Sequence, residues 1–395
     1  MTVTRIQKPA ARSERQAMRR FSVLTFVMLF AVVTLQCRSL PYYDQAINGQ
    51  MEIFRKQESI TDLVDNPETP APLRKKFIFI QSVRDFAEKE LHLPVNDNYL
   101  NYVALDRPYV VWNVFAAPQF SLTPKTWCFP IVGCVTYRGY FAEDDARRFG
   151  DSLKQEGYDV FIGGAIAYST LGWFDDPVLS TFISLSEPDT AALIFHELAH
   201  GLLYIKDDTA FNESFATAVE QEGLRRWQAS ANDPKGYEKW LRKHQCRRKF
   251  TSLVSKYRAR LEALYQQDLP LAAKQKQKAA VFNQMKTEFR DLRSEDGAMA
   301  AFDAWFNYPL NNAQLISVST YYNWEPAFNA MLAECGGDLK KFYQKCRKLA
   351  KKKPAERNRI LKQYMNKTGL PKGPIMALKA CRVAANGKRS SPLND

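Results

Sequence analysis

Two histidines four residues apart place the strongest constraint on this chain. They belong to the segment His196-Glu197-Leu198-Ala199-His200, an HExxH pattern. Residues i and i+4 share one face of an α-helix, so this segment predicts a helix on which both imidazoles can hold one metal ion. Glu197 is rotated by about 100° from His196 on an ideal helix and can flank the ion as a general base.

A third ligand is available in the next helical stretch. HExxH alone is a short pattern, but the chain has only four histidines and two of them lie in it. Glu213 follows in a second stretch that reads as a helix. Two histidines and one carboxylate leave a fourth position open for water, as in catalytic zinc sites. His196, His200 and Glu213 are therefore the predicted ligands of one Zn²⁺, which lowers the pKa of a bound water towards ~7.

Residues 196–216 resemble the gluzincin metallopeptidases, in which HExxH and a later glutamate bind zinc. Asn212-Glu213-Ser214-Phe215-Ala216 is close to the NEGFA stretch of zinc aminopeptidases, although the linker before it is shorter here.

The resemblance to gluzincins implies two supporting residues. Glu220 lies seven residues after Glu213 on the same helix face, so it could accept the outer N–H of a ligand histidine; a solvated Glu220 is the alternative. Tyr321 or Tyr322 could donate to the oxyanion formed in amide hydrolysis, and the resemblance favours Tyr321. A tyrosine packed in the core is the alternative for either.

Segments outside the motif resemble a bacterial family described as predicted aminopeptidases, from about residue 42 to about residue 351. The segments are Tyr42-Tyr43, Trp112-Asn113-Val114, Trp127-Cys128-Phe129-Pro130, Gly133-Cys134-Val135, Tyr137-Arg138-Gly139-Tyr140-Phe141, Ala167-Tyr168-Ser169-Thr170-Leu171-Gly172-Trp173-Phe174 and Asp176-Pro177. The resemblance implies a zinc peptidase, and aminopeptidase action would further need an acid for the free α-amine. Asp175, Asp176 and Glu143 are the candidates.

The N-terminus carries the pattern of an export signal. Residues 1–20 contain six Lys or Arg and one Glu, residues 21–36 are uncharged and apolar, and Cys37 follows. This order resembles a lipoprotein signal peptide with Cys37 as the lipidated residue, although Gln36 replaces the usual small residue. An uncleaved anchor is the alternative, since sixteen residues span only ~24 Å as a helix. Either reading predicts a bacterial envelope protein, membrane-anchored with its body in the periplasm; a cytosolic body with a buried helix is the minority reading.

Six further cysteines remain, and none forms a CxxC pair. Cys128 and Cys134 are the best candidates for a disulfide, because Pro130 and Gly133 suggest a turn between two strands. Two free buried thiols are the alternative.

Hydrophobic periodicity predicts an α+β, mostly helical fold. Before the HExxH helix we expect helices at 42–60 and 72–91 and strands at 109–115, 132–137 and 158–167. These strands would form a small mixed sheet of a zincin-like core, with 158–168 as the edge that pairs with an extended peptide.

Capping residues predict where the HExxH helix and the helix after it begin, and the pattern of polar residues predicts the elements that follow. Asp189 or Thr190 can cap the HExxH helix, and Asp208 or Thr209 can start the next one. Residues 237–264 and 271–292 predict a long helical hairpin with charged outer faces, on which His244 is expected to be a surface residue.

Four regions follow from these patterns: a signal or anchor (1–37), a zincin-like catalytic region (38–233), a helical region that completes the cleft (234–339) and a basic helical tail (340–395). The tail has seventeen Lys or Arg and two acids in a chain of net charge +14. A solvated basic face is the preferred reading of it, and contact with nucleic acid or an anionic membrane surface is the alternative. Without a nucleic-acid-binding motif we expect no nucleic-acid partner.

The sequence thus predicts a zinc peptidase, and by resemblance an aminopeptidase, that hydrolyses a peptide substrate with Glu197 as general base. The alternative is a non-catalytic zinc-binding scaffold or assembly factor of the envelope.

Overall fold

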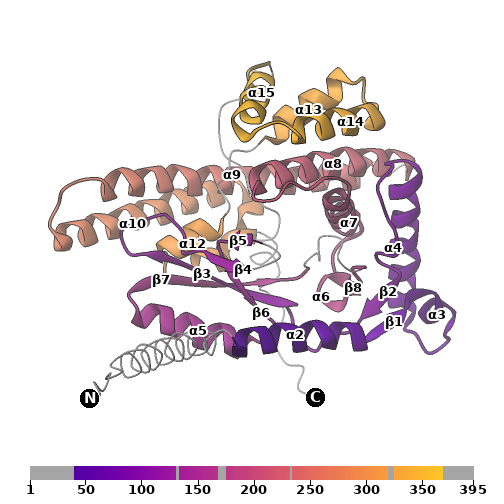
Figure 1. The fold of residues 1–395 in the computed structure, drawn as a ribbon, viewed down its shortest axis with the longest axis horizontal. Helices are drawn as coiled ribbons and strands as arrows, with labels where there is room; N and C mark the ends of the chain where they lie inside the picture. The colour runs from indigo at the N-terminus through magenta and orange to yellow at the C-terminus, as the bar shows by residue number, and fades with distance from the viewer. Residues whose placement is uncertain (1–39, 130–132, 168–174, 232–233, 319–323, 368–395) are drawn as a thin grey trace, which may run out of the picture. The chain divides into compact units, whose positions relative to one another are not determined.

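The computed structural model describes residues 40–129, 133–167, 175–231, 234–318 and 324–367. These residues are mostly helical and include three small sheets, which confirms the predicted α+β, mostly helical class (Figure 1). Within these ranges no helix is both long enough and apolar enough to cross a membrane. The apolar run 21–36 and Cys37 lie outside the described residues, so the predicted anchor or lipid stays a prediction.

The chain divides into two compact units, residues 1–54 and 55–395. The described part of the first lies in the helix α2 (Leu40–Arg55), whose last residue already belongs to the second. The prediction of a helix through residue 60 is wrong beyond Arg55, because Gln57–Ser59 forms the strand β1 of the second unit. This strand pairs with residues 101–103, a distant contact that periodicity within one segment could not show.

One small sheet of the second unit has the order β1-β2-β8. β2 (Asn101–Val103) pairs antiparallel with β1 and parallel with β8 (Val178–Leu179). The short helices α3 (Ile60–Asp65) and α6 (Ser180–Ile183) follow β1 and β8 directly. Helix α4 (Ala71–Lys89) confirms the helix predicted at 72–91, and it packs its apolar face on α7.

The second three-stranded sheet has the order β6-β3-β7 and is antiparallel throughout. Its strands are β3 (Val111–Pro118), β6 (Arg138–Tyr140) and β7 (Tyr158–Ala165). Helix α5 (Glu143–Gln155) packs on β3 and β7, and α12 (Asn312–Ser317) contacts the same two strands. Among the described residues β7 is an edge strand, as the sequence predicted.

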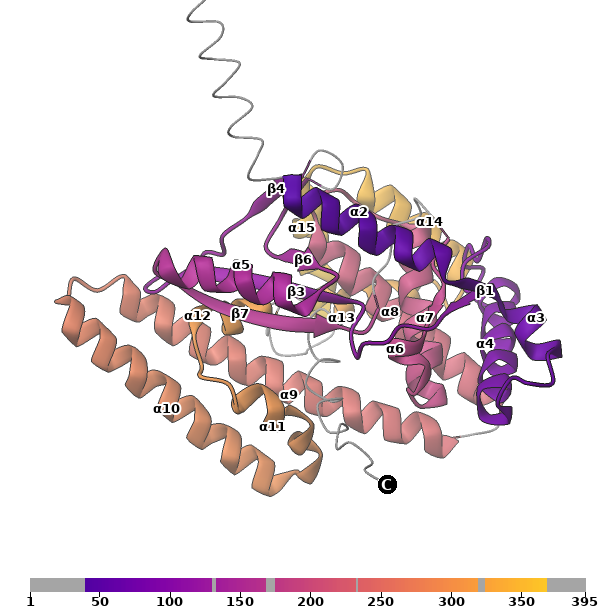
Figure 2. The same cartoon turned by 90° about the horizontal axis from the view of Figure 1, so that it is seen from below.

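The predicted helical hairpin is present as α9 (Pro234–Tyr265) and α10 (Leu271–Glu295), which run side by side in Figure 2. Its inner face joins the short helices η1 (Gly297–Phe302) and α11 (Asp303–Phe306) in one apolar cluster. Phe250 stacks on Phe302 with ring centroids 4.2 Å apart, and Phe289 stacks on Phe306 at 3.8 Å. The apolar side chains of α9 and α10 face this cluster. The charged side chains lie on the exposed outer faces, which explains why both helices have long polar sequences.

Two buried helices occupy the middle of the second unit, α7 (Glu187–Leu202) and α8 (Thr209–Ser230). Three later helices cover the outer side of α8: α13 (Glu325–Glu334), α14 (Leu339–Ala350) and α15 (Pro354–Lys367) (Figure 1). Phe215 of α8 meets Phe328 and Phe342 at this interface. The aromatic layer fixes one side of α8 and leaves its other side to α7.

The close approach of α7 and α8 depends on Gly223. A Cβ at this position would lie 2.7 Å from Leu91 Cδ1 and 2.9 Å from Phe195 Cδ2, and both side chains are fully buried. We expect Gly223→Ala to lower the free energy of unfolding by about 1–3 kcal/mol through overpacking, although alanine favours a helix. Urea unfolding followed by circular dichroism measures the change.

Gly201→Ala in α7 is the matched control. Its Cβ would lie 3.7 Å from Pro94 Cγ, an ordinary contact, so its stability should stay equal or rise slightly. If both alanine variants unfold at the same urea concentration, the packing argument for Gly223 is wrong.

Candidate metal centre

Helix α7 begins earlier than its sequence suggested. Ser186 is the N-cap, its hydroxyl accepts from the backbone N–H of Asp189, and Pro188 lies in the first turn. Serine followed by proline is a favourable helix start, so the predicted caps Asp189 and Thr190 are wrong. Residues 190–200 are all buried. The HExxH motif therefore lies inside the protein.

The connection between α7 and α8 turns the chain back on itself. Asn212 holds this turn with two hydrogen bonds to one residue: its Oδ1 accepts from Ile205 N–H at 2.8 Å and its Nδ2 donates to Ile205 O at 2.7 Å. Asp208 caps α8 by accepting from Phe211 N–H at 3.1 Å, which confirms the predicted helix start. Glu213 thereby comes to lie on the first turns of α8, facing α7.

The three predicted ligands converge. Glu213 places one carboxylate oxygen 3.4 Å from His196 Nε2 and the other 3.6 Å from His200 Nε2. The two imidazole rings are 4.9 Å apart between centroids and nearly perpendicular. One ligand atom from each residue lies within 4.8 Å of the others, in the one such group that the described residues contain. Two nitrogens and one carboxylate are a donor set that fits a zinc ion with an open coordination position.

Glu220 contacts His196 at the ring nitrogen that does not face Glu213. Its Oε2 lies 3.0 Å from His196 Nδ1, and each side chain is 1% exposed. The carboxylate accepts the Nδ1 proton, which leaves Nε2 directed to Glu213 and the metal position. Burial lowers the pKa of His196, but hydrogen bonds and charges from Glu213 and Glu220 outweigh it and raise that pKa to about 9.

Glu197, the predicted base, is buried on α7 next to His196, with 7% of its surface exposed. Tyr321 lies outside the described residues, and so does Tyr322. The backbone N–H of Trp324 donates to Ser214 Oγ at 3.0 Å, one residue from Glu213.

His244 is buried, so its prediction as a surface residue is wrong. It stacks on Trp240 at 5.1 Å, its Nε2 lies 2.9 Å from Gln221 Nε2, and it faces Glu325 at 3.8 Å. Glu325 is 2% exposed. Burial would raise its pKa, but the nearby His244 ring outweighs burial and keeps that pKa below its ordinary value. Basic residues surround His244 in the sequence, so the sequence did not indicate that this face of α9 is buried. It packs on α8 at Gln221, which adjoins Glu220.

The three acids considered for the α-amine occupy different settings. Glu143 pairs with Arg147 in the first turns of α5, and Asp175 is exposed. Asp176 is buried, and its backbone N–H donates to Asn98 Oδ1 at 2.8 Å. Of the three, Asp176 is the one that is buried.

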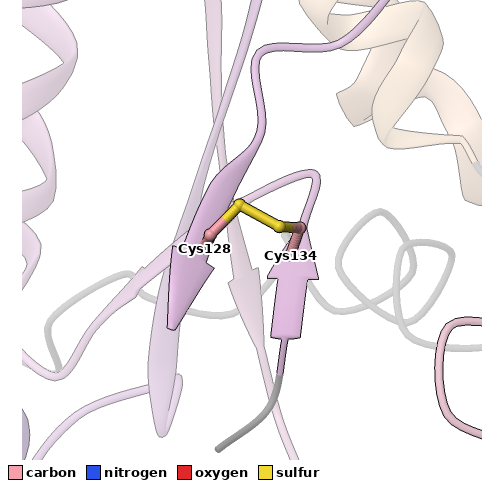
Figure 3. The surroundings of a disulfide bond; sticks show 2 residues. All are labelled: Cys128 and Cys134. Carbon is pink, nitrogen blue, oxygen red and sulfur yellow. A yellow bond between two sulfur atoms is a disulfide. The ribbon is translucent and has the colours of Figure 1, made fainter. Parts of the chain in front are cut away.

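Cys128 and Cys134 form a disulfide with an S–S distance of 1.98 Å. It joins the paired strands β4 (Trp127–Phe129) and β5 (Gly133–Val135), as Figure 3 shows. Gly133, at φ +75°, lies against the α7–α8 connection, because a Cβ there would be 3.0 Å from Asp207 Oδ1. The disulfide hairpin therefore contacts the turn between the metal-ligand helices.

The comparisons with known proteins agree in part with this site. A family model described as "Putative aminopeptidase" matches residues 41–361, which include the whole candidate metal centre. No curated protein and no solved structure matches the chain.

The raised pKa of His196 predicts a pH-dependent metal affinity. With its pKa raised to about 9, metal-free His196 is protonated on both ring nitrogens below that pH, and a metal ion must displace the Nε2 proton. Zinc affinity should therefore rise about tenfold per pH unit between about pH 6.5 and 8.5. Glu220→Gln removes one source of the raised pKa, so the slope should flatten and the affinity at pH 8.5 should fall roughly 10- to 100-fold. Competition with a chromogenic chelator measures both.

Glu222→Gln is the matched control on the same helix, because Glu222 pairs with Arg225 and Arg226 instead. It should keep the wild-type affinity and slope. A Glu220→Gln protein that binds zinc like this control would refute the role given to Glu220.

Proposed function

The chain belongs to the aminopeptidase family whose model matches residues 41–361, and we propose that it is a zinc-dependent peptidase of the gluzincin type with a zincin-like core. One observation carries the proposal: α7 and α8 bring His196, His200 and Glu213 together around one point. We further propose that it is an aminopeptidase, which requires a substrate with a free N-terminus. This part of the proposal follows from the family description.

Zinc is the metal that this donor set favours, and when bound it supplies the Lewis acidity that makes water nucleophilic near neutral pH. His196 and His200 would hold the ion through their Nε2 atoms, and Glu213 through its carboxylate. Glu220 keeps the His196 ring in one orientation by accepting its Nδ1 proton.

Glu197 is the proposed general base. Its carboxylate takes the proton of the attacking water and later gives it to the leaving amine. Glu197 is 7% exposed and shares the helix α7 with both histidines, which places the proposed base beside them. Tyr321 is proposed as the donor to the oxyanion, on the strength of the resemblance to gluzincins.

The edge strand β7 is the proposed docking site for an extended peptide. It forms one edge of the β6-β3-β7 sheet among the described residues. A peptide added to such an edge gains main-chain hydrogen bonds whatever its side chains are. Asn311 Nδ2 donates to Val160 O at 3.0 Å, so α12 covers the first half of β7 and the peptide would pair with the second half.

Export to the periplasm is also proposed, with the membrane held by residues 21–36 or by a lipid on Cys37. The Cys128–Cys134 disulfide supports it, because disulfides persist in oxidising compartments.

Glu197→Gln tests the proposed chemistry. We expect this variant to bind one zinc ion per chain and to lose at least about 10²-fold in kcat, since the base is gone and the ligands remain. Metal analysis and cleavage of a peptide panel with free and blocked N-termini measure the two properties. Glu187→Gln, on the exposed first turn of the same helix, should cleave like the wild type.

The peptide panel separates the remaining possibilities. Cleavage of free N-termini alone establishes an aminopeptidase, and cleavage of blocked peptides establishes an endopeptidase. Wild-type protein that holds zinc and cleaves neither would support the alternative of a non-catalytic scaffold or assembly factor.

A further inference from the structure

The start of α8 depends on one carboxylate that has two functions. Asp208 Oδ1 accepts from Phe211 N–H and so caps the helix that carries Glu213. Asp208 Oδ2 accepts from both Nε and NH2 of Arg357, with Nε at 2.9 Å. The cap of the metal-ligand helix is therefore joined to a residue 149 positions later in the chain.

Arg357 is almost fully buried, with 3% of its surface exposed. Its NH1 donates to Lys352 O at 2.8 Å, and its guanidinium lies over the Phe211 ring at 5.6 Å. The Arg357 side chain thus contacts Asp208 and Phe211 at the first turn of α8. The remaining guanidinium nitrogen, Nη1, donates to the carbonyl oxygens of Ala350 and Lys352, which precede α15.

The metal ligand Glu213 follows Phe211 by two residues. A shift of Asp208 or Phe211 moves the first turn of α8, and Glu213 moves with it relative to His196 and His200 on α7. The Glu213 oxygens stand 3.4 and 3.6 Å from the two imidazoles, so a displacement of ~1 Å is large on the scale of a metal–ligand bond of ~2 Å. Two guanidinium N–H groups donate to Asp208 Oδ2 while Oδ1 accepts from Phe211 N–H, so both oxygens of this carboxylate are held in place.

Stability alone gives a weak account of this pair. A buried ion pair loses much solvation, and well-packed apolar residues often stabilise a fold equally well. The paired donation from Arg357 to Asp208 Oδ2, together with the helix cap on Oδ1, points instead to a role in placing the start of α8.

We propose that Arg357 is a positioning residue of the metal centre, which holds Asp208 and Phe211 so that Glu213 meets the two histidines. The inference rests on the proposed metal site, and it does not depend on peptidase action. It gives the helix α15, in the basic C-terminal region, a function in metal binding.

A double variant separates positioning from stability. Asn is as good an N-cap as Asp, so Asp208→Asn with Arg357→Met keeps the cap and leaves no unpaired charge. We expect this protein to melt close to the wild type and to bind zinc roughly tenfold more weakly. Arg357→Lys keeps the charge without the paired donation and should also bind zinc more weakly. Arg359→Met, on an exposed position of α15, is the control and should match the wild type.

The measurements are zinc affinity by chelator competition at pH 7.5 with Zn²⁺ alone, thermal melting without metal, and amide hydrogen exchange at residues 211–213. Weaker zinc binding and faster exchange in variants that melt like the wild type support the inference. Unchanged zinc affinity, affinity that follows the melting temperature across all variants, or failure of both Arg357 variants to fold would overturn it. Wild-type protein that binds no zinc would end this inference and the proposed function together, whereas an inactive protein that binds zinc would affect the proposed function alone.

Discussion

The packing of α7 against α8 is the constraint on which the rest of this structure depends. Residues 190–200 of α7 are buried, and three of them are ionisable. Buried polar groups are costly unless another group satisfies them, and α8 supplies the carboxylates of Glu213 and Glu220 for this purpose. These contacts satisfy polar groups of the buried histidines. They also direct the Nε2 atoms of both rings at the carboxylate of Glu213. The metal-binding geometry is thus a product of core packing.

The parts of the site that sequence analysis could predict are those set by local spacing. His196 and His200 share a face because they are four residues apart, and Glu213 and Glu220 share one because they are seven apart. The helices α4, α7 to α10 and the strand β7 also follow from periodicity. Cys128 and Cys134 were the best pair because of the turn residues between them, and the structure joins them.

The parts that could not be predicted depend on contacts between distant segments. Arg357 reads as one cation in a basic tail until Asp208 is placed beside it. His244 lies among basic residues that hide its packing against α8. The strand β1 has only three residues and pairs with β2 across the chain. In each case the deciding interaction is tertiary, and no periodicity within a single segment records it.

The α7–α8 connection has a further consequence for how such a chain can vary. Connections between helices are ordinarily where insertions and deletions are accepted, because they lie at the surface with few contacts. Here the connection meets Gly133 of the disulfide hairpin at Asp207 and Arg357 at Asp208, and Asn212 closes it from within. A single added residue would have to disturb all three contacts. The length of this short turn is therefore expected to be as invariant among functional versions of the protein as the histidines themselves.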